Sequence, residues 1–142
     1  MLSLSHCQRI FLARAPADMR KGINGLAALV CAQLDRDPLS GDAFVFISNH
    51  RRMVKILVWD VSGYWLANKR LERGTFAVAG RLGSRTARGS HALSVAEVMA
   101  IIEGIDIRSA AYHQHYTHTP TRLHASEISS DDPNLKAPVS PI

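Results

Sequence analysis

A tight reversal at Asp60-Val61-Ser62-Gly63 constrains the fold of this chain more than any other feature. The aspartate accepts hydrogen bonds within its own turn, and the glycine supplies the positive φ that such a turn needs. Residues 53–59 before the turn and 64–72 after it are rich in β-branched, aromatic and aliphatic side chains. A further apolar run over 44–47 precedes them. The pattern predicts three successive strands, the last two of which form a hairpin.

The hairpin gathers basic side chains at the end away from its turn. A turn centred on 60–63 places Lys55 opposite Asn68 or Lys69, and places Arg51 at the level of residues 71–73. Like charges that face each other across a strand pair are destabilising, so folding alone gives no reason for this arrangement. We therefore predict an anionic partner for six side chains, which have only Glu72 among them to offset the charge: Arg51, Arg52, Lys55, Lys69, Arg70 and Arg73.

The charge distribution agrees with a polyanionic partner. The 142 residues carry a net charge of +5, and residues 1–90 contain 14 Lys/Arg against 6 Asp/Glu. A basic excess confined to one part of a chain favours nucleic acid as the partner. No run approaches the roughly 20 apolar residues of a membrane helix, and the opening residues lack the pattern of a secretory signal. We expect a cytoplasmic protein with reduced cysteines, no membrane partner and no metal or other cofactor.

The rest of the chain predicts one α+β domain over residues 1–108. We expect an opening strand over 8–13, and a helix from Met19 to about Asp35 whose N-cap is Asp18. A mobile basic loop is predicted over 79–90. A second helix is then predicted to open at Ser94 and to stop near Gly104, with a capping box. The predicted fold is an antiparallel sheet of about four strands with two helices, followed by a disordered tail over 109–142.

Arg20 and Lys21 admit two interpretations. They lie in the first turn of the predicted helix, where the helix dipole disfavours cations. They are either solvated side chains partly neutralised by Asp18, or a phosphate site at a helix N-terminus. Both interpretations stay open at this point.

Other residues could form a metal site or stack on bases, but each also has an ordinary structural role. Asp18, Asp60 and Glu72 could form a metal-binding carboxylate set, yet each has a local cap, turn or ion pair to make. The four histidines between 113 and 124 lie in the predicted tail without a scaffold for a metal. We expect Trp59 to belong to the core, whereas Trp65 is as consistent with base stacking as with packing.

In their order along the chain, several motifs resemble a known family. They are Asp18-Met19-Arg20-Lys21-Gly22, Asp37-Pro38, Phe44-Val45-Phe46, Arg51-Arg52, Lys55, Trp59-Asp60, Gly63, Lys69-Arg70-Leu71-Glu72-Arg73-Gly74 and Phe76. The chain resembles the small accessory protein, often called TnpB, of the IS66 class of bacterial insertion sequences. The resemblance covers about residues 10–76, and the Ser94 helix and residues 103–106 are similar to the usual ending of the family. After Phe76 the chain departs from the family pattern, because Ala79-Gly80 replaces an aromatic and a proline.

The resemblance implies a product of a mobile element that works beside a separate, larger transposase. Joined to the charge pattern, it predicts a non-catalytic accessory protein that binds DNA phosphates through the basic hairpin, with Arg20 and Lys21 as a second anchor. Two alternatives remain open. One is an adaptor that docks the transposase without touching DNA, and the other is a metal-dependent nuclease.

Overall fold

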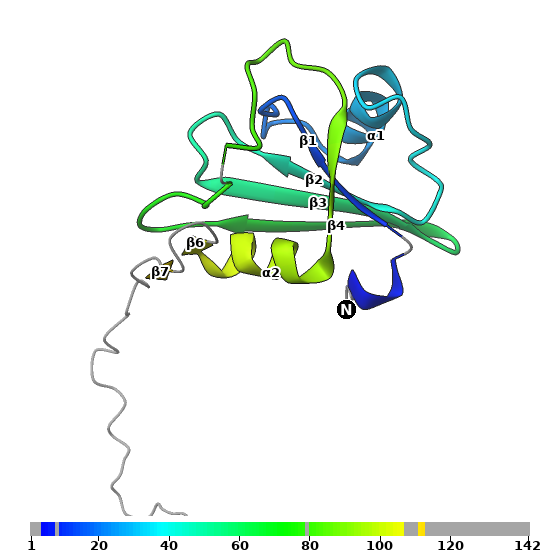
Figure 1. The fold of residues 1–142 in the computed structure, drawn as a ribbon. Coiled ribbons are helices and arrows are strands. Elements are labelled where there is room, and N and C mark those ends of the chain that lie inside the picture. The colour runs from blue at the N-terminus through cyan, green and yellow to red at the C-terminus, as the bar shows by residue number, and fades with distance from the viewer. Residues whose placement is uncertain (1–3, 8, 79, 107–110, 113–142) are drawn as a thin grey trace, which may run out of the picture.

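A five-stranded sheet with one helix on each face forms the core of the protein. The computed structural model describes residues 4–7, 9–78, 80–106 and 111–112. The sheet order is β4-β3-β2-β1-β5, with α1 on one side and α2 on the other (Figure 1). Its elements are β1 (Ile10–Ala13), α1 (Ile23–Ala32), β2 (Ala43–Ile47), β3 (Met53–Asp60), β4 (Gly63–Arg70), β5 (Ser90–Leu93) and α2 (Val95–Glu103), preceded by a 3-10 turn (Leu4–His6) and followed by β6 (Ile105–Asp106) and β7 (Ala111–Tyr112).

The predicted α+β class and the two helices agree with the structure, but the predicted sheet of about four antiparallel strands is wrong in two respects. The sheet has five strands, and β1 pairs with β2 in parallel. Parallel neighbours need a long crossover, and the segment that contains α1 provides it. The missed strand, β5, is four residues long and follows an Arg-, Gly- and Ser-rich stretch. Its antiparallel pairing with β1 is a long-range contact that local pattern does not reveal.

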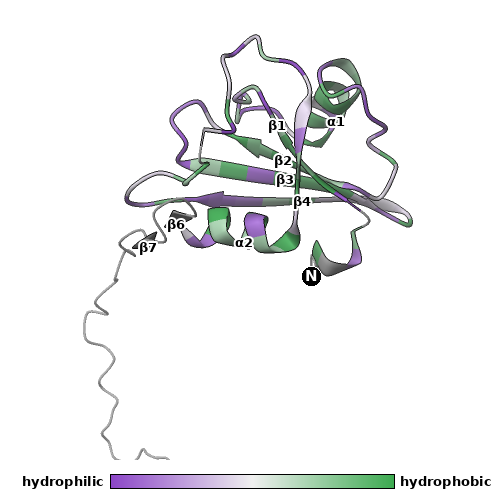
Figure 2. Cartoon of the chain, viewed as in Figure 1, coloured by the Kyte–Doolittle hydropathy of each residue, from purple (hydrophilic) through white to green (hydrophobic). Residues whose placement is uncertain are grey.

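Both faces of the sheet are buried at its centre. Every residue of β2 is buried, because its alternate side chains enter two separate clusters. On the α1 side, Phe44 and Phe46 pack with Leu26 of the helix. On the α2 side, Val45 and Ile47 pack with residues of that helix. The apolar strands at the centre of the sheet and the polar loops at its margin are visible in Figure 2.

The hairpin and α2 form where the sequence predicted them. The register of β3 and β4 places Lys55 opposite Asn68, with Asp60 and Gly63 flanking the turn. The predicted positive φ at Gly63 is wrong, because the left-handed residue of the turn is Val61, at φ 52°. At the start of α2, the Ser94 hydroxyl accepts from the Glu97 N–H while the Glu97 carboxylate accepts from the Ser94 N–H. Gly104 ends the helix in the left-handed region at φ 82°. Among the described residues, no helix is long and apolar enough to cross a membrane.

Helix α1 is shorter than predicted at both ends. It begins at Ile23 with Gly22 at the N-cap position, so Asp18 is not its cap. The Lys21 N–H instead donates to the Asp18 carbonyl, which closes a separate turn before the helix. The helix ends at Ala32, since the chain turns into the left-handed region at Asp35, where φ is 54°.

The segment from 71 to 89 crosses one end of the sheet, from β4 back to β1. Backbone N–H groups of Leu71 and Phe76 donate to the carbonyls of Arg52 and Arg51, and that of Gly83 donates to the Arg14 carbonyl. The segment is therefore anchored along the sheet end, although its described residues, 71–78 and 80–89, have no regular structure before β5 begins. The predicted tail over 109–142 lies outside the described residues except for 111–112, which pair with Ile105–Asp106.

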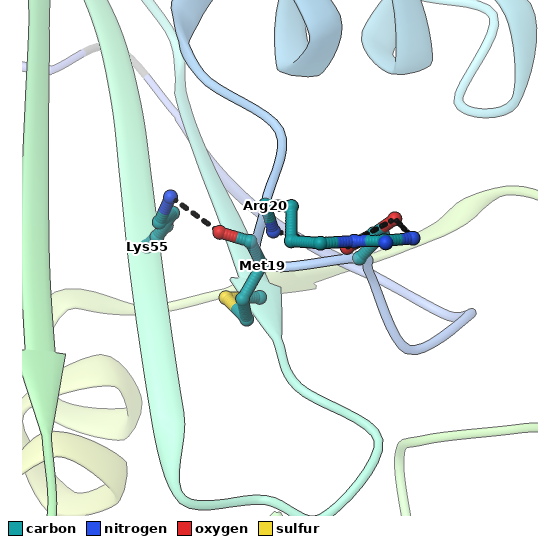
Figure 3. A network of polar contacts seen from close by, with 4 residues as sticks. Met19, Arg20 and Lys55 are labelled. Atoms are coloured by element: carbon teal, nitrogen blue, oxygen red, sulfur yellow. Dashed lines mark hydrogen bonds and ion pairs between the residues drawn. The ribbon is translucent and has the colours of Figure 1, made fainter.

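Lys55 ties the turn before α1 to the sheet. Its Nζ donates to the carbonyl of Met19 at 2.8 Å and to that of Lys21 at 3.0 Å, from a half-buried position on β3. Figure 3 shows the ammonium group pointing at the Met19 carbonyl, while the Arg20 side chain runs in another direction. Lys69 makes a single comparable bond to the Ile102 carbonyl, and this bond is exposed.

Replacing Lys55 by methionine is expected to lower the free energy of unfolding by about 1.5–3 kcal/mol, because two carbonyls lose a charged donor inside the fold. Urea unfolding followed by tryptophan fluorescence measures the change. Lys69→Met is the matched control, and its exposed single bond predicts a loss below about 1 kcal/mol. Equal losses in the two variants would contradict the role given to Lys55.

Candidate nucleic-acid interface

Four loop segments converge at one end of the sheet. Strands β1 and β2 run in parallel and end there, and the antiparallel β3 begins there after the loop over 48–52. Strand β4 also ends there, and β5 begins there, because each is antiparallel to its neighbour. The segments over 14–21, 48–52, 69–73 and 80–89 therefore meet, and we call their surface the basic end.

The basic end carries a strong excess of positive charge. Its four segments contain eleven Lys/Arg and two acids, Asp18 and Glu72. The opposite end differs, since Asp42 is buried there against Arg9 and Asp60 lies in the β3–β4 turn. The eleven residues are Arg14, Arg20, Lys21, Arg51, Arg52, Lys69, Arg70, Arg73, Arg81, Arg85 and Arg88.

Arg51 and Arg52 extend from a backbone that is held rigidly. The Ser48 hydroxyl accepts from the N–H groups of Arg52 and Met53, and the Ser48 carbonyl accepts from the Arg51 N–H. Arg51 has a φ of 58°, in the left-handed region that favours glycine. Both side chains are exposed, and within the described part of the chain neither guanidinium has a hydrogen bond or an ion pair.

Arg20 and Arg70 each face an exposed carboxylate nearby in sequence. The Arg20 guanidinium donates to both oxygens of Asp18, with a closest distance of 2.8 Å, and Arg70 reaches Glu72 at 3.0 Å. These hydrogen bonds from Arg20 hold the pKa of Asp18 well below its usual range. Exposed pairs of this kind contribute little to stability, so the arginines can be shared with another anion.

The structure separates the remaining predicted residues. Lys55 and Lys69 lie on opposite faces of the sheet, since Lys55 reaches the turn before α1 and Lys69 reaches the end of α2. Their ammonium groups have internal carbonyl partners, so the six hairpin cations do not form one continuous face. Lys21 is half-buried beside this turn, and Arg73 is exposed in the segment after β4.

Four arginines of the basic end were missed as site candidates, and one of them, Arg81, is paired with Glu97 of α2 at 2.7 Å. Arg14 follows β1, and Arg85 and Arg88 come from the 80–89 segment that folds back toward it. Arg88 donates to the Ala32 carbonyl at the end of α1, where a cation is favourable, at 2.6 Å. Arg85 is exposed and lines a hollow together with Arg20. The charge of the predicted loop was the available signal, but its return to β1 was not visible in the sequence.

Two hollows open on the basic end on either side of Asp18 and Asn49. One, of about 510 Å³, has Met19, Met53 and Leu71 in its lining, together with Arg52 and Arg70. The other, of about 320 Å³, is bordered by Arg20 and Arg85.

The carboxylates of the nuclease alternative do not meet. Asp18 and Glu72 lie at the basic end, whereas Asp60 lies in the β3–β4 turn and accepts from the Trp65 indole N–H at 3.2 Å. Among the described residues, no group of three or more His, Cys, Asp or Glu could hold a metal ion. Trp59 is half-buried and packs edge-on against Tyr64, while Trp65 is 45% exposed.

Comparisons with known proteins support the family resemblance. The model of a family described as IS66 Orf2 like protein matches residues 8–112. Two uncharacterized proteins of Sinorhizobium fredii are similar. The protein y4hO is 33% identical over 87% of this chain and 99% of its own length, and y4jC is 43% identical over 54% of this chain and 65% of its own length.

No solved structure matches the chain. The names of the two relatives state no activity, so they add nothing about DNA. The family match covers both helices and the whole five-stranded sheet, including the parallel pair and the loops that form the basic end. The chain belongs to the IS66 Orf2-like family of transposition-associated accessory proteins.

Proposed function

We propose that this protein binds DNA through backbone phosphates at the basic end of its sheet and thereby assists the transposase of the same element. The observation that carries the proposal is the pair Arg51 and Arg52, exposed and without a partner in the described part of the chain. Their backbone is fixed by the Ser48 hydroxyl and carbonyl. Charges held in this way cost self-repulsion in the free protein and are neutralised when phosphates bind.

The surrounding residues fit the same role. Arg20, Arg70 and Arg85 border the two hollows beside the pair, and among the described residues the first two have only exposed carboxylates as partners. Lys55 and Lys69 contribute charge at a distance, since their ammonium groups already bind carbonyls. Contacts of this type position a protein on DNA without reading its sequence. The proposed interaction is therefore non-specific and sensitive to salt.

An adaptor that docks the transposase is the second candidate, and the larger hollow favours it. Met19, Met53 and Leu71 give that hollow an apolar lining, and Arg52 and Arg70 contribute positive charge to it. This surface suits an acidic peptide with apolar side chains as well as a nucleotide. Copurification with the transposase after nuclease treatment, joined to a failure to bind DNA, would favour the adaptor.

Removing the two partnerless charges is expected to weaken DNA binding and its salt dependence. Contact with about five or six phosphates predicts that log affinity falls with log salt at a slope near −5. In Arg51→Gln/Arg52→Gln the slope is expected to become shallower by about 2, with weaker binding to every duplex sequence. Fluorescence anisotropy of a labelled duplex across a salt series measures both quantities.

The control removes the same net charge at the other end of the sheet. Val61 and Ser62 lie in the exposed β3–β4 turn, and the double variant Val61→Glu/Ser62→Glu lowers the net charge by two, as Arg51→Gln/Arg52→Gln does. Its salt slope is expected to match that of the natural chain. Equal weakening in the two double variants would mean that total charge governs binding, which would contradict a site at the basic end.

Arg51→Gly separates binding from folding. Because φ at Arg51 is 58°, glycine relieves a left-handed conformation and is expected to raise the free energy of unfolding by about 1 kcal/mol. The same change removes a phosphate contact and is expected to weaken DNA binding. Arg52→Gly has no such conformational gain, so it is expected to lower both the free energy of unfolding and the affinity for DNA. Urea unfolding and anisotropy test the pair, and undiminished binding by stabilised Arg51→Gly would count against the proposal.

A further inference from the structure

We propose that the outer edge of β4 pairs with β4 of a second copy of this chain, antiparallel and about a two-fold axis. Strand β4 ends the five-stranded order and, within the described part of the chain, has only β3 as a strand neighbour. It is eight residues long, and its sequence, GYWLANKR, contains no proline. Its pairing with β3 is continuous from Gly63 to Arg70, without a bulge. Long, regular edges of this kind are templates for another strand.

The hairpin geometry determines which groups face outward. A two-residue turn makes Asp60 and Gly63 a hydrogen-bonded pair, and the odd-numbered residues of β4 then bond to β3. The Leu71 N–H, which donates to Arg52, continues this alternation. The N–H and C=O groups of Tyr64, Leu66, Asn68 and Arg70 therefore point away from the sheet. Among the described residues, none of these groups has a backbone hydrogen-bond partner outside the β3–β4 ladder.

One antiparallel register uses all four outward residues of each copy. It places Ala67 against Ala67 of the second copy at the two-fold axis, Leu66 against Asn68, and Tyr64 against Arg70. The two strands would share about eight main-chain hydrogen bonds. This arrangement is isologous, and the same patch serves both subunits, as in most homodimers.

The side chains favour a second copy as the occupant of this edge. In this register Trp65 faces Lys69 on the α2 side of the sheet, and Tyr64 faces Arg70 on the α1 side. Trp65 is 45% exposed, and Lys69 and Arg70 are exposed as well. Each cation has one exposed partner in the described part of the chain, the Ile102 carbonyl for Lys69 and the Glu72 carboxylate for Arg70, so a cation–aromatic pair across the dimer would compete with a single exposed contact. A parallel arrangement would instead bring the cations of the two strands together. The aromatic start and cationic end of β4 make it complementary to its own reversed copy.

The first test is the mass of the full chain in solution. Analytical ultracentrifugation between about 5 and 200 μM is expected to show a species of twice 15.6 kDa. Asn68→Pro removes an outward N–H without touching the β3 ladder, and is expected to lower the dimer affinity at least tenfold. Asn68→Ala keeps that N–H and is expected to stay dimeric. A monomeric natural chain, or two variants with the same dimer affinity, would overturn the proposal.

Circular dichroism checks whether Asn68→Pro is folded, and a cross-link tests the register independently. Non-hydrogen-bonded antiparallel neighbours lie about 4.5 Å apart at Cα, within disulfide reach. In a Cys31→Ser background, which removes an exposed thiol, Ala67→Cys is expected to form a covalent dimer on mild oxidation. The exposed turn residue in Ser62→Cys is expected to stay monomeric. The proposed register would be overturned if Ala67→Cys formed no covalent dimer, or if Ala67→Cys and Ser62→Cys cross-linked equally. If the chain is monomeric alone and associates only with added transposase, the β4 edge would be the binding site for the transposase instead.

Discussion

The parallel pairing of β1 and β2 is the constraint on which the rest of the molecule depends. Because α1 lies on the connection between them, both strands end at the same side of the sheet. The antiparallel strands β3, β4 and β5 then place their own loops at that side as well. Arginine-rich segments far apart in the sequence are thus brought together, and Asp18 and Glu72 are the acids that they contain. Such convergence opposes folding electrostatically, and the anionic partner that we propose would give it a use.

The sequence predicted the local structure well and the tertiary arrangement less well. The hairpin, its register at Lys55 and the Ser94 capping box depend on residues close in sequence, and all three are confirmed. The parallel pair and β5 depend on long-range pairing, and neither was predicted. The same division holds for the candidate site, since the clustered charge is visible in the sequence, while its role in binding stays a prediction. The sequence did not show which of these cations already have partners inside the fold. The Met19 carbonyl accepts from Lys55, and the Ile102 carbonyl accepts from Lys69.

Two surfaces of different chemistry follow from this sheet. The basic end is formed by loops and presents arginines, whereas the β4 edge presents main-chain groups flanked by aromatic and cationic side chains. Antiparallel pairing of two β4 edges would place the two basic ends at opposite ends of a continuous sheet. One dimer would then offer two separate phosphate-binding surfaces, which suits an accessory protein of an element that has two ends. This combination requires both proposals, and each has its own test.

A residue-level map of the DNA contact tests the central claim most directly. The full chain, labelled with ¹⁵N, is titrated with a short duplex at low salt, and the backbone amide and arginine Nε resonances are followed. The account predicts that the largest shifts fall in residues 14–21, 48–52, 70–73 and 80–89, and that the β3–β4 turn around Val61 stays unchanged. Shifts centred on that turn or on α2, or no shifts at all, would contradict it.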